Sequence, residues 1–190
     1  YDLPAEKVVV TLPGYDDKRF NPSVIKEKQK IKSVAAKYKI TGDYLIFLGT
    51  LQPRKNLPAL IEALASLSNQ TIKLVVVGMI SEGRGGWMYH PIFDKVKSLG
   101  LGHRVIFTSY VPDQDVPFLF AGSKGYVLPS LYEGFGIPPI EAMACGVPVV
   151  VSKSSSLPEI CGSAAFYIDD PANPASIKNS IETLLSQNLT

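Results

Sequence analysis

The sequence predicts an α/β protein with a Rossmann-like, three-layer α/β/α arrangement around a parallel sheet. Short apolar segments typical of buried strands alternate with amphipathic segments of helical spacing along most of the chain. Glycine and proline separate these segments. With 190 residues, 46% of them hydrophobic, the chain can form one well-packed domain. Strands that alternate with helices imply a parallel sheet covered on both faces.

The elements follow in chain order. The expected strands are short apolar runs at 44–48, 72–77, 105–107, 125–128, 147–151 and 164–168. The expected helices have apolar residues at helical spacing or a proline start, at 23–38, 57–67, 91–99, 116–121, 137–145 and 177–185. Asn56 is the expected N-terminal cap of the second helix, and residues 157–160 are expected to form a turn.

Composition excludes several classes of function. Lys and Arg exceed Asp and Glu by only 19 to 17, so bulk charge does not indicate a nucleic-acid partner. No apolar run approaches the ~20 residues of a membrane helix and no signal peptide opens the chain, so we expect a cytoplasmic location. Cys145 and Cys161 lack metal-site spacing and are expected to be buried, and His90 and His103 stand alone. A metal held by the protein is therefore not expected.

The most informative stretch is 129–146, in which Glu133 and Glu141 stand eight positions apart across a Gly-Phe-Gly turn. Pro138 and Pro139 indicate that a helix begins near this turn. A glycine turn at a helix N-terminus favours anions, whereas carboxylates accept hydrogen bonds from hydroxyls. A nucleotide sugar meets both requirements, because its phosphates suit the glycine turn and its sugar hydroxyls can donate to the carboxylates. A capped helix with two surface glutamates is the alternative.

Other polar stretches also follow predicted strands, where ligands bind in parallel sheets. Arg54 and Lys55 follow the first strand and suit a diphosphate, although an exposed basic pair is the alternative. The Gly/Trp-containing loop 78–87 has neither the P-loop nor the dinucleotide-binding pattern, so it is either a ligand loop or a surface loop. Residues 110–112 follow the third strand and are a second such case. They form either a ligand loop or only a turn that the proline initiates.

Several motifs together carry a family resemblance: FLGTLQPRKNLPALIEAL, LGHRVIFTSYVPD, EGFGIPPIE, AMACGVPVV and SSSLPEI. In this order they resemble the retaining, family-four glycosyltransferases of the GT-B fold, and specifically their C-terminal, donor-binding domain. The resemblance covers nearly the whole chain. It implies an interdomain linker at 1–22, a nucleotide-sugar-binding domain at 23–190, and an N-terminal acceptor domain outside this sequence. The start at Tyr1 agrees with a piece of a larger enzyme.

The resemblance also implies roles in binding the sugar and the ribose. Glu141 would bind the ribose hydroxyls, and Glu133 would hold hydroxyls of the transferred sugar. The backbone amides of Gly134, Phe135 and Gly136 would line that sugar.

The remaining implied roles concern the diphosphate and the base. Lys55 and Arg54 would stabilise the leaving diphosphate, replacing the divalent metal of other transferases, so no metal cofactor is expected. The backbone at Val111 would read the base, and Gly49 and Thr50 would contact the donor. Thr50 departs from the family, because many members have Arg at this position. Arg54 would substitute for it.

The implied reaction moves a hexose, with mannose from GDP-mannose as first choice and UDP-sugars next, to a glycan or lipid-linked acceptor in polysaccharide assembly. The anomeric configuration is retained, and the donor's own phosphate oxygen takes the acceptor proton. The isolated domain is expected to be inactive.

A basic run at 26–32 could contact the inner face of a membrane, although a solvated helix face explains it more simply. The alternatives are a non-catalytic nucleotide-sugar-binding module or another GT-B enzyme, such as a sugar-nucleotide epimerase or a phosphorylase.

Overall fold

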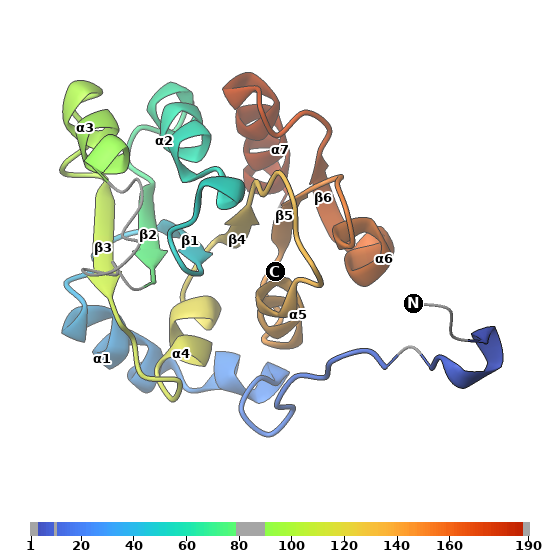
Figure 1. Ribbon diagram of the computed structural model, residues 1–190. Coiled ribbons are helices and arrows are strands. Elements are labelled where there is room, and N and C mark those ends of the chain that lie inside the picture. Colours follow the sequence, from blue (N-terminus) through green and yellow to red (C-terminus); the bar gives the residue numbers. More distant parts are fainter. Residues whose placement is uncertain (1–3, 10, 79–89, 188–190) are drawn as a thin grey trace.

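A six-stranded, all-parallel sheet forms the centre of the computed structural model, which describes residues 4–9, 11–78 and 90–187 (Figure 1). The strand order is β3-β2-β1-β4-β5-β6. The strands are β1 (Tyr44–Leu48), β2 (Lys73–Val77), β3 (Val105–Ser109), β4 (Gly125–Leu128), β5 (Val149–Ser152) and β6 (Ala165–Ile168). The predicted α/β class with a parallel sheet is confirmed.

Helices cover both faces of this sheet. The α-helices are α1 (Lys28–Lys37), α2 (Leu57–Ser66), α3 (His90–Ser98), α4 (Val116–Ala121), α5 (Ile137–Ala144), α6 (Leu157–Cys161) and α7 (Pro174–Ser186). Single 3-10 turns are η1 (Ala5–Lys7), η2 (Pro22–Lys26), η3 (Pro53–Lys55) and η4 (Gly162–Ala164). Figure 1 shows α2, α3 and α7 on one face and α1, α4 and α5 on the other. Of the helices described, none has both the length and the apolar character to cross a membrane.

The core lies in the central strands, as the apolar runs predict. The side chains of Leu45, Ile46 and Phe47 in β1 are wholly buried, and β4 and β5 are buried along their whole length. Burial of such side chains contributes about 1.5 to 3 kcal/mol each to folding. Tyr126 in β4 is also buried, and its hydroxyl donates to the Leu48 carbonyl at 3.3 Å.

Proline explains two differences from the predicted elements. The strand predicted from 147 begins at Val149, because Pro148 has no N–H to donate and contributes only its carbonyl, to Tyr126 N–H. The turn predicted at 157–160 is instead the short helix α6, which contains Pro158 in its first turn, where proline is tolerated. Cys161 consequently lies at the end of a helix and not after a turn.

The helix predicted at 23–38 is divided in two. Residues Pro22–Lys26 form a 3-10 turn, and α1 starts after Glu27, whose dihedral angles (φ −82°, ψ 53°) are not helical. This change of direction lets Val24 from the turn and Val34 from α1 both become buried. The predicted apolar stripe is therefore correct, although one continuous helix does not present it.

The segment before η2 meets the sheet domain at Phe20. Phe20 is buried and packs on Phe120 of α4 with ring centroids 6.2 Å apart. Arg19 beside it pairs with Asp113 at 3.2 Å. Figure 1 shows residues 4–9 and 11–15 extending away from the sheet, and the side chains of 6–9 and 11–15 are exposed. Packing against the domain thus begins three positions before the predicted boundary at residue 23.

The strand order reverses between β1 and β4. In a doubly wound sheet of order 3-2-1-4-5-6, the loops leaving these two neighbouring strands turn to opposite faces and open a crevice at their carboxyl ends. The loop after β1 carries Arg54 and Lys55, and the loop after β4 carries Glu133. The fold therefore brings these residues to the place where such sheets bind ligands.

Candidate functional site

A tight turn directs the two cations of the β1–α2 loop toward β4. Arg54 and Lys55 complete the 3-10 turn η3, and Asn56 follows in the left-handed conformation with φ 55°. The Arg54 carbonyl accepts the Leu131 N–H at 2.7 Å, which joins this turn to the loop after β4. Asn56 occupies the predicted N-cap position, but its side-chain amide donates to the Pro171 carbonyl and does not cap α2.

Glu133 lies at the centre of a cluster of charged and polar groups. Its Oε1 accepts from Lys55 Nζ at 2.9 Å and from the Ser130 hydroxyl at 2.6 Å, and its Oε2 accepts from an Arg54 guanidinium nitrogen at 2.7 Å. The side chains of Lys55 and Glu133 are only 8% and 7% exposed, whereas that of Arg54 is 41% exposed. Lys55 and Glu133 thus form a buried ion pair, and Arg54 completes it from the solvent side.

This environment keeps Glu133 ionised. Burial alone would raise the pKa of Glu133, but hydrogen bonds from Ser130, Lys55 and Arg54 outweigh burial and hold the pKa below its ordinary value. An ionised carboxylate can only accept hydrogen bonds. At neutral pH, Glu133 is therefore an acceptor beside two cations.

Glu141 has a different environment, although it belongs to the same motif. It lies on α5, one turn beyond its start, as predicted, and its carboxylate forms no hydrogen bond or ion pair with any described residue. Burial raises the pKa of Glu141, Asp113 and Asp16 add to this effect, and Arg19 opposes it. Its oxygens therefore remain available to donors of a ligand.

The Gly-Phe-Gly turn connects the two glutamates. Gly136 precedes α5 with φ 107°, a conformation that L side chains rarely adopt. A Cβ at this position would also lie 2.8 Å from Leu157 Cδ2 of α6. Pro138 and Pro139 follow in the first turn of α5, so the predicted helix start is confirmed. Gly134, Phe135 and Gly136 thus bring the backbone from Glu133 directly to a helix N-terminus.

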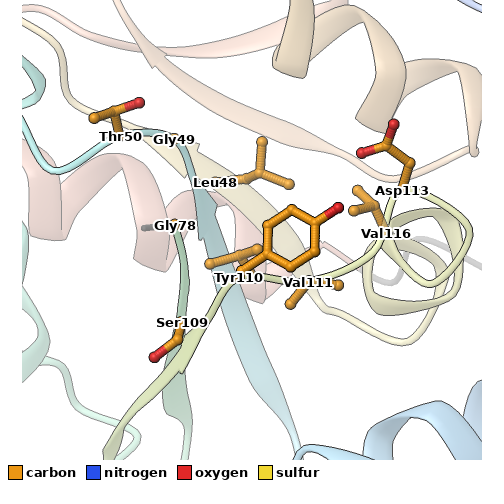
Figure 2. Close-up of a pocket in the computed structure, with 10 residues that line it drawn as sticks. Leu48, Gly49, Thr50, Gly78, Ser109, Tyr110, Val111, Asp113 and Val116 are labelled. Atoms are coloured by element: carbon orange, nitrogen blue, oxygen red, sulfur yellow. The ribbon is translucent and has the colours of Figure 1, made fainter. Parts of the chain in front are cut away.

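A pocket opens beside this cluster at the carboxyl ends of β1, β2 and β3 (Figure 2). Gly49, Thr50 and Val111, three residues predicted to contact a donor, are among its lining residues. The others are Leu48, Val77, Gly78, Ser109, Tyr110, Asp113 and Val116. Its volume of about 260 Å³ lies below the ~300–1,000 Å³ of typical small-molecule sites, so it has room for one part of a larger ligand.

Gly49 connects the pocket with the charged cluster. It lines the pocket and has φ 153°, and a Cβ at this position would lie 2.9 Å from Cε of Lys55. The Lys55 side chain therefore packs directly behind the pocket wall. A ligand that fills the pocket could extend past Gly49 to Lys55 and Glu133.

Sequence reasoning missed the serines of the site. Ser130 donates to Glu133, and serines of the β5–α6 loop hydrogen-bond the backbone of the Glu133 loop. The signal in the sequence is a run of serines directly after a buried strand, at 152 and 154–156. Beyond Gly78, the predicted Gly/Trp loop at 78–87 lies outside the described residues.

Two free cysteines, Cys145 and Cys161, lie at the ends of α5 and α6. Burial was predicted for both cysteines and is confirmed, and it raises the pKa of each thiol to about 11. Both are therefore neutral thiols at physiological pH. Within residues 4–9, 11–78 and 90–187, no group of three or more His, Cys, Asp or Glu side chains could hold a metal ion.

A crevice at a strand-order reversal, with a cation pair and an accepting carboxylate beside a pocket, defines a ligand-binding domain of the doubly wound class. The chain belongs to the glycosyl transferases group 1 family, whose pattern it matches over residues 27–190. It is 34% identical over 170 residues to the O-antigen chain mannosyltransferase B of Escherichia coli. That alignment covers 89% of this chain and 43% of the relative, so the chain spans less than half of that protein.

Several solved structures share the fold. The Anabaena protein HepE in complex with UDP has a TM-score of 0.80 and 27% identity, over 98% of this chain and 50% of HepE. The C-terminal domain of the glycosyl transferase group 1 protein LpcC from Francisella tularensis has a TM-score of 0.76 and 25% identity. That match covers 92% of this chain and 89% of the LpcC domain.

Proposed function

We propose that this chain is the donor-binding, C-terminal half of a retaining GT-B glycosyltransferase. The reaction would transfer a hexose, with mannose as first choice, from a nucleotide diphosphate sugar to a hydroxyl of a glycan or lipid-linked acceptor. The observation that carries the proposal is the cluster of Lys55, Arg54 and Glu133 beside the pocket at the strand-order reversal. The mannosyltransferase relative supports mannose as the sugar, for which GDP-mannose is our first choice of donor, and the neighbour solved with UDP keeps UDP-sugars as the second choice.

In this proposal the pocket and Glu141 bind the nucleoside. The base would lie in the pocket against the backbone at Val111, with Gly49 and Thr50 lining its path toward the diphosphate. Glu141 would accept hydrogen bonds from the ribose hydroxyls, because its carboxylate has no partner among the described residues.

The charged cluster would act on the sugar and the diphosphate. Glu133 would accept hydrogen bonds from sugar hydroxyls while the amides of Gly134, Phe135 and Gly136 line the sugar. Lys55 and Arg54 would stabilise the charge that grows on the leaving diphosphate as the glycosidic bond breaks, which lowers the barrier rather than only increasing affinity. No metal is required in this scheme. The new bond to the acceptor oxygen forms on the same face, and the acceptor proton passes to the leaving phosphate oxygen.

The acceptor would bind a second domain, connected through residues 1–22 as linker. Large apolar side chains are exposed around the carboxyl ends of the strands: Tyr110 (64%), Leu131 (48%), Tyr132 (63%) and Ile137 (37%). Surfaces of this kind mark contacts with another domain or ligand. Closure of that domain over the donor would complete the catalytic site, so the chain alone would bind donor without transferring sugar.

Nucleotide binding tests the proposal directly. We expect one of GDP, UDP or ADP to bind this chain by calorimetry in the millimolar to micromolar range, equivalent to ~4 to 8 kcal/mol. Glu141→Ala should weaken that binding at least tenfold, because the ribose hydroxyls lose their acceptor. Glu159→Ala is the matched control, since Glu159 is an exposed glutamate of α6. Equal binding by the two variants would contradict the role given to Glu141.

Turnover distinguishes a transferase from the other functions. The full-length protein should transfer sugar from the matching donor to an acceptor, and the isolated chain should not. Binding without transfer by the full-length protein would indicate a non-catalytic binding module. Conversion of the nucleotide sugar without any acceptor product would indicate an epimerase.

We also propose that the protein is cytoplasmic and contacts the inner face of the membrane through α1. Residues 26–39 contain six lysines, all exposed, and one glutamate, although the whole chain has a net charge of only +2. The opposite helical layer is balanced, with Lys95, Lys97 and Lys178 against Glu62, Asp94 and Glu182. Clusters of four to eight basic residues favour anionic lipid surfaces by roughly 1 kcal/mol per residue.

Vesicle binding tests the membrane contact. Lys28→Gln with Lys32→Gln should weaken binding of the full-length protein to anionic vesicles by about 30-fold, the equivalent of ~2 kcal/mol. Lys95→Gln with Lys97→Gln on α3 removes the same charge from the balanced layer and should have less effect. Equal binding to vesicles of neutral lipid would exclude the electrostatic contact.

A further inference from the structure

The loop between β5 and α6 holds the Glu133 loop through side chains. Four serines in and directly after β5, here called the serine cluster, are Ser152, Ser154, Ser155 and Ser156. Each of them forms a hydrogen bond with the backbone of the loop between β4 and α5, which carries Glu133. This contact lies between two loops that leave neighbouring parallel strands.

The first two serines fix the start of the loop. The hydroxyls of Ser152 and Ser154 both donate to the Ser130 carbonyl, at 2.6 Å and 3.1 Å. Ser130 in turn donates its own hydroxyl to Oε1 of Glu133. The serine cluster therefore determines where the Ser130 hydroxyl meets the carboxylate.

The next two serines fix the backbone of Glu133 itself. The Ser155 hydroxyl accepts the Glu133 N–H at 2.9 Å. The Ser156 hydroxyl donates to the carbonyl of Glu133 at 3.1 Å and to that of Phe135 at 2.8 Å. The backbone pairing of β4 with β5 extends to Leu128 and Val151, and beyond these residues the serine side chains take over the contact.

Ser155 adopts an unfavourable backbone conformation to make its contact. Its φ of 49° lies in the left-handed region, where glycine or asparagine is usual. Such conformations persist when the surrounding structure requires them, and they concentrate at functional sites. The hydroxyl of Ser155, which glycine would lack, is the acceptor for the Glu133 N–H.

We propose that the serine cluster positions Glu133 and the Gly134–Gly136 turn against the sugar of the donor, without touching the nucleotide. This inference rests on the proposed function, because it assigns the serines to the sugar-binding half of that site. The nucleoside half, formed by the pocket and Glu141, receives none of the hydrogen bonds of the cluster. Loss of a cluster hydroxyl should therefore impair transfer while sparing nucleotide affinity.

Ser156 gives the most direct test. In the full-length protein, Ser156→Ala should lower kcat for sugar transfer by about 10- to 100-fold, because small displacements of a binding group are costly to reaction rates. The Kd for the nucleoside diphosphate should stay within twofold. Ser156→Thr retains the hydroxyl and should restore kcat.

Two further variants separate positioning from general stability. Ser180→Ala on α7 is the matched control, because Ser180 is also half-buried and also donates to two carbonyls, those of Tyr167 and Ser176. It should leave kcat unchanged. Ser155→Gly relieves the backbone strain and removes the acceptor, so it should reduce kcat with little change in the midpoint of thermal unfolding.

The inference is overturned if Ser156→Ala and Ser155→Gly retain kcat within threefold of Ser180→Ala, or if nucleotide affinity falls in parallel with kcat. Absence of transfer by the unaltered full-length protein with every GDP- and UDP-sugar would instead reject the proposed function. In that case the pKa of the Glu133 carboxyl, followed by NMR, decides on the serine cluster. Ser156→Ala should raise this pKa relative to Ser180→Ala, and an unchanged value would overturn the inference.

Discussion

Lys55→Met should reduce sugar transfer by the full-length protein about 10²- to 10³-fold, the largest catalytic loss that we expect from a single substitution. Lys55 Nζ is buried, lies 2.9 Å from Glu133, and packs behind the wall of the pocket at the strand ends. In the proposed reaction it faces the charge that develops on the leaving diphosphate. Removing one preorganised donor of this kind typically costs ~3 to 4 kcal/mol of transition-state stabilisation. Steady-state kinetics with the identified donor measures the loss.

Lys55→Met should also lower the stability of the folded protein, for a different reason. Lys55→Met removes a charge-assisted hydrogen bond to Glu133, which costs about 1.5 to 3 kcal/mol of unfolding free energy. Glu133→Gln alone leaves Lys55 buried without a carboxylate and should cost at least as much. The double variant, Lys55→Met with Glu133→Gln, removes both charges of the buried pair. It should recover stability relative to the sum of the single variants, while transfer stays low.

Arg54→Ala provides the matched comparison. Arg54 contacts the same carboxylate, but its side chain is 41% exposed, so its loss should cost less than about 1 kcal/mol of stability. If Lys55→Met and Arg54→Ala lowered the unfolding free energy equally, burial of the Lys55–Glu133 pair would not increase its contribution to stability. If Lys55→Met left kcat unchanged, the proposed role of Lys55 at the diphosphate would be wrong.

The stability that the Lys55–Glu133 pair contributes should depend on pH. The pKa of Glu133 is lowered in the folded protein, so its stabilising effect is present above the unfolded value of ~4.3 and disappears as pH falls through the folded value. In Lys55→Met the carboxylate loses a donor and its folded pKa should rise. Acid unfolding of this variant should therefore begin at higher pH than in the unaltered protein.

The sheet could be predicted from the sequence because its signals are local. The buried apolar runs at 44–48 and 125–128 have the same bounds as β1 (Tyr44–Leu48) and β4 (Gly125–Leu128). Prediction was less accurate at 105–107, where β3 continues to Ser109, and at some prolines. Pro158 reads as a turn in the sequence but belongs to the first turn of α6.

For the candidate site, the sequence indicated which strand ends carry polar residues but not which of these residues contact one another. The rule that ligands bind at the carboxyl ends of parallel strands indicated both Lys55 and Glu133. Only the strand order, with β1 beside β4, reveals that the two side chains form an ion pair. The serine cluster escaped prediction for the same reason, because its hydrogen bonds join residues more than 20 positions apart.

Gly78 follows β2 at a point where two strand ends almost touch. A Cβ built on Gly78 would overlap the carbonyl oxygen of Gly49, the residue that follows β1. The two ends are held in place by backbone hydrogen bonds, from Gly49 N–H to the Val77 carbonyl and from Gly78 N–H to the Ser109 carbonyl. Because the atom in the way belongs to the backbone, no change of side-chain rotamer can relieve the overlap. Both glycines also line the pocket.

Gly78→Ala should therefore separate the ends of β1 and β2 and damage both the fold and the pocket that we propose for the nucleotide. We expect a loss of about 2 to 3 kcal/mol of unfolding free energy, as for other overpacked sites, and a fall of ~4 to 12 °C in the unfolding midpoint. Nucleoside diphosphate binding should fall below detection by calorimetry. Gly102→Ala, at a glycine with open space around it, is the control and should change neither. Nucleotide binding by Gly78→Ala as strong as that of the unaltered chain would show that the close approach of the two strand ends is unnecessary for the pocket.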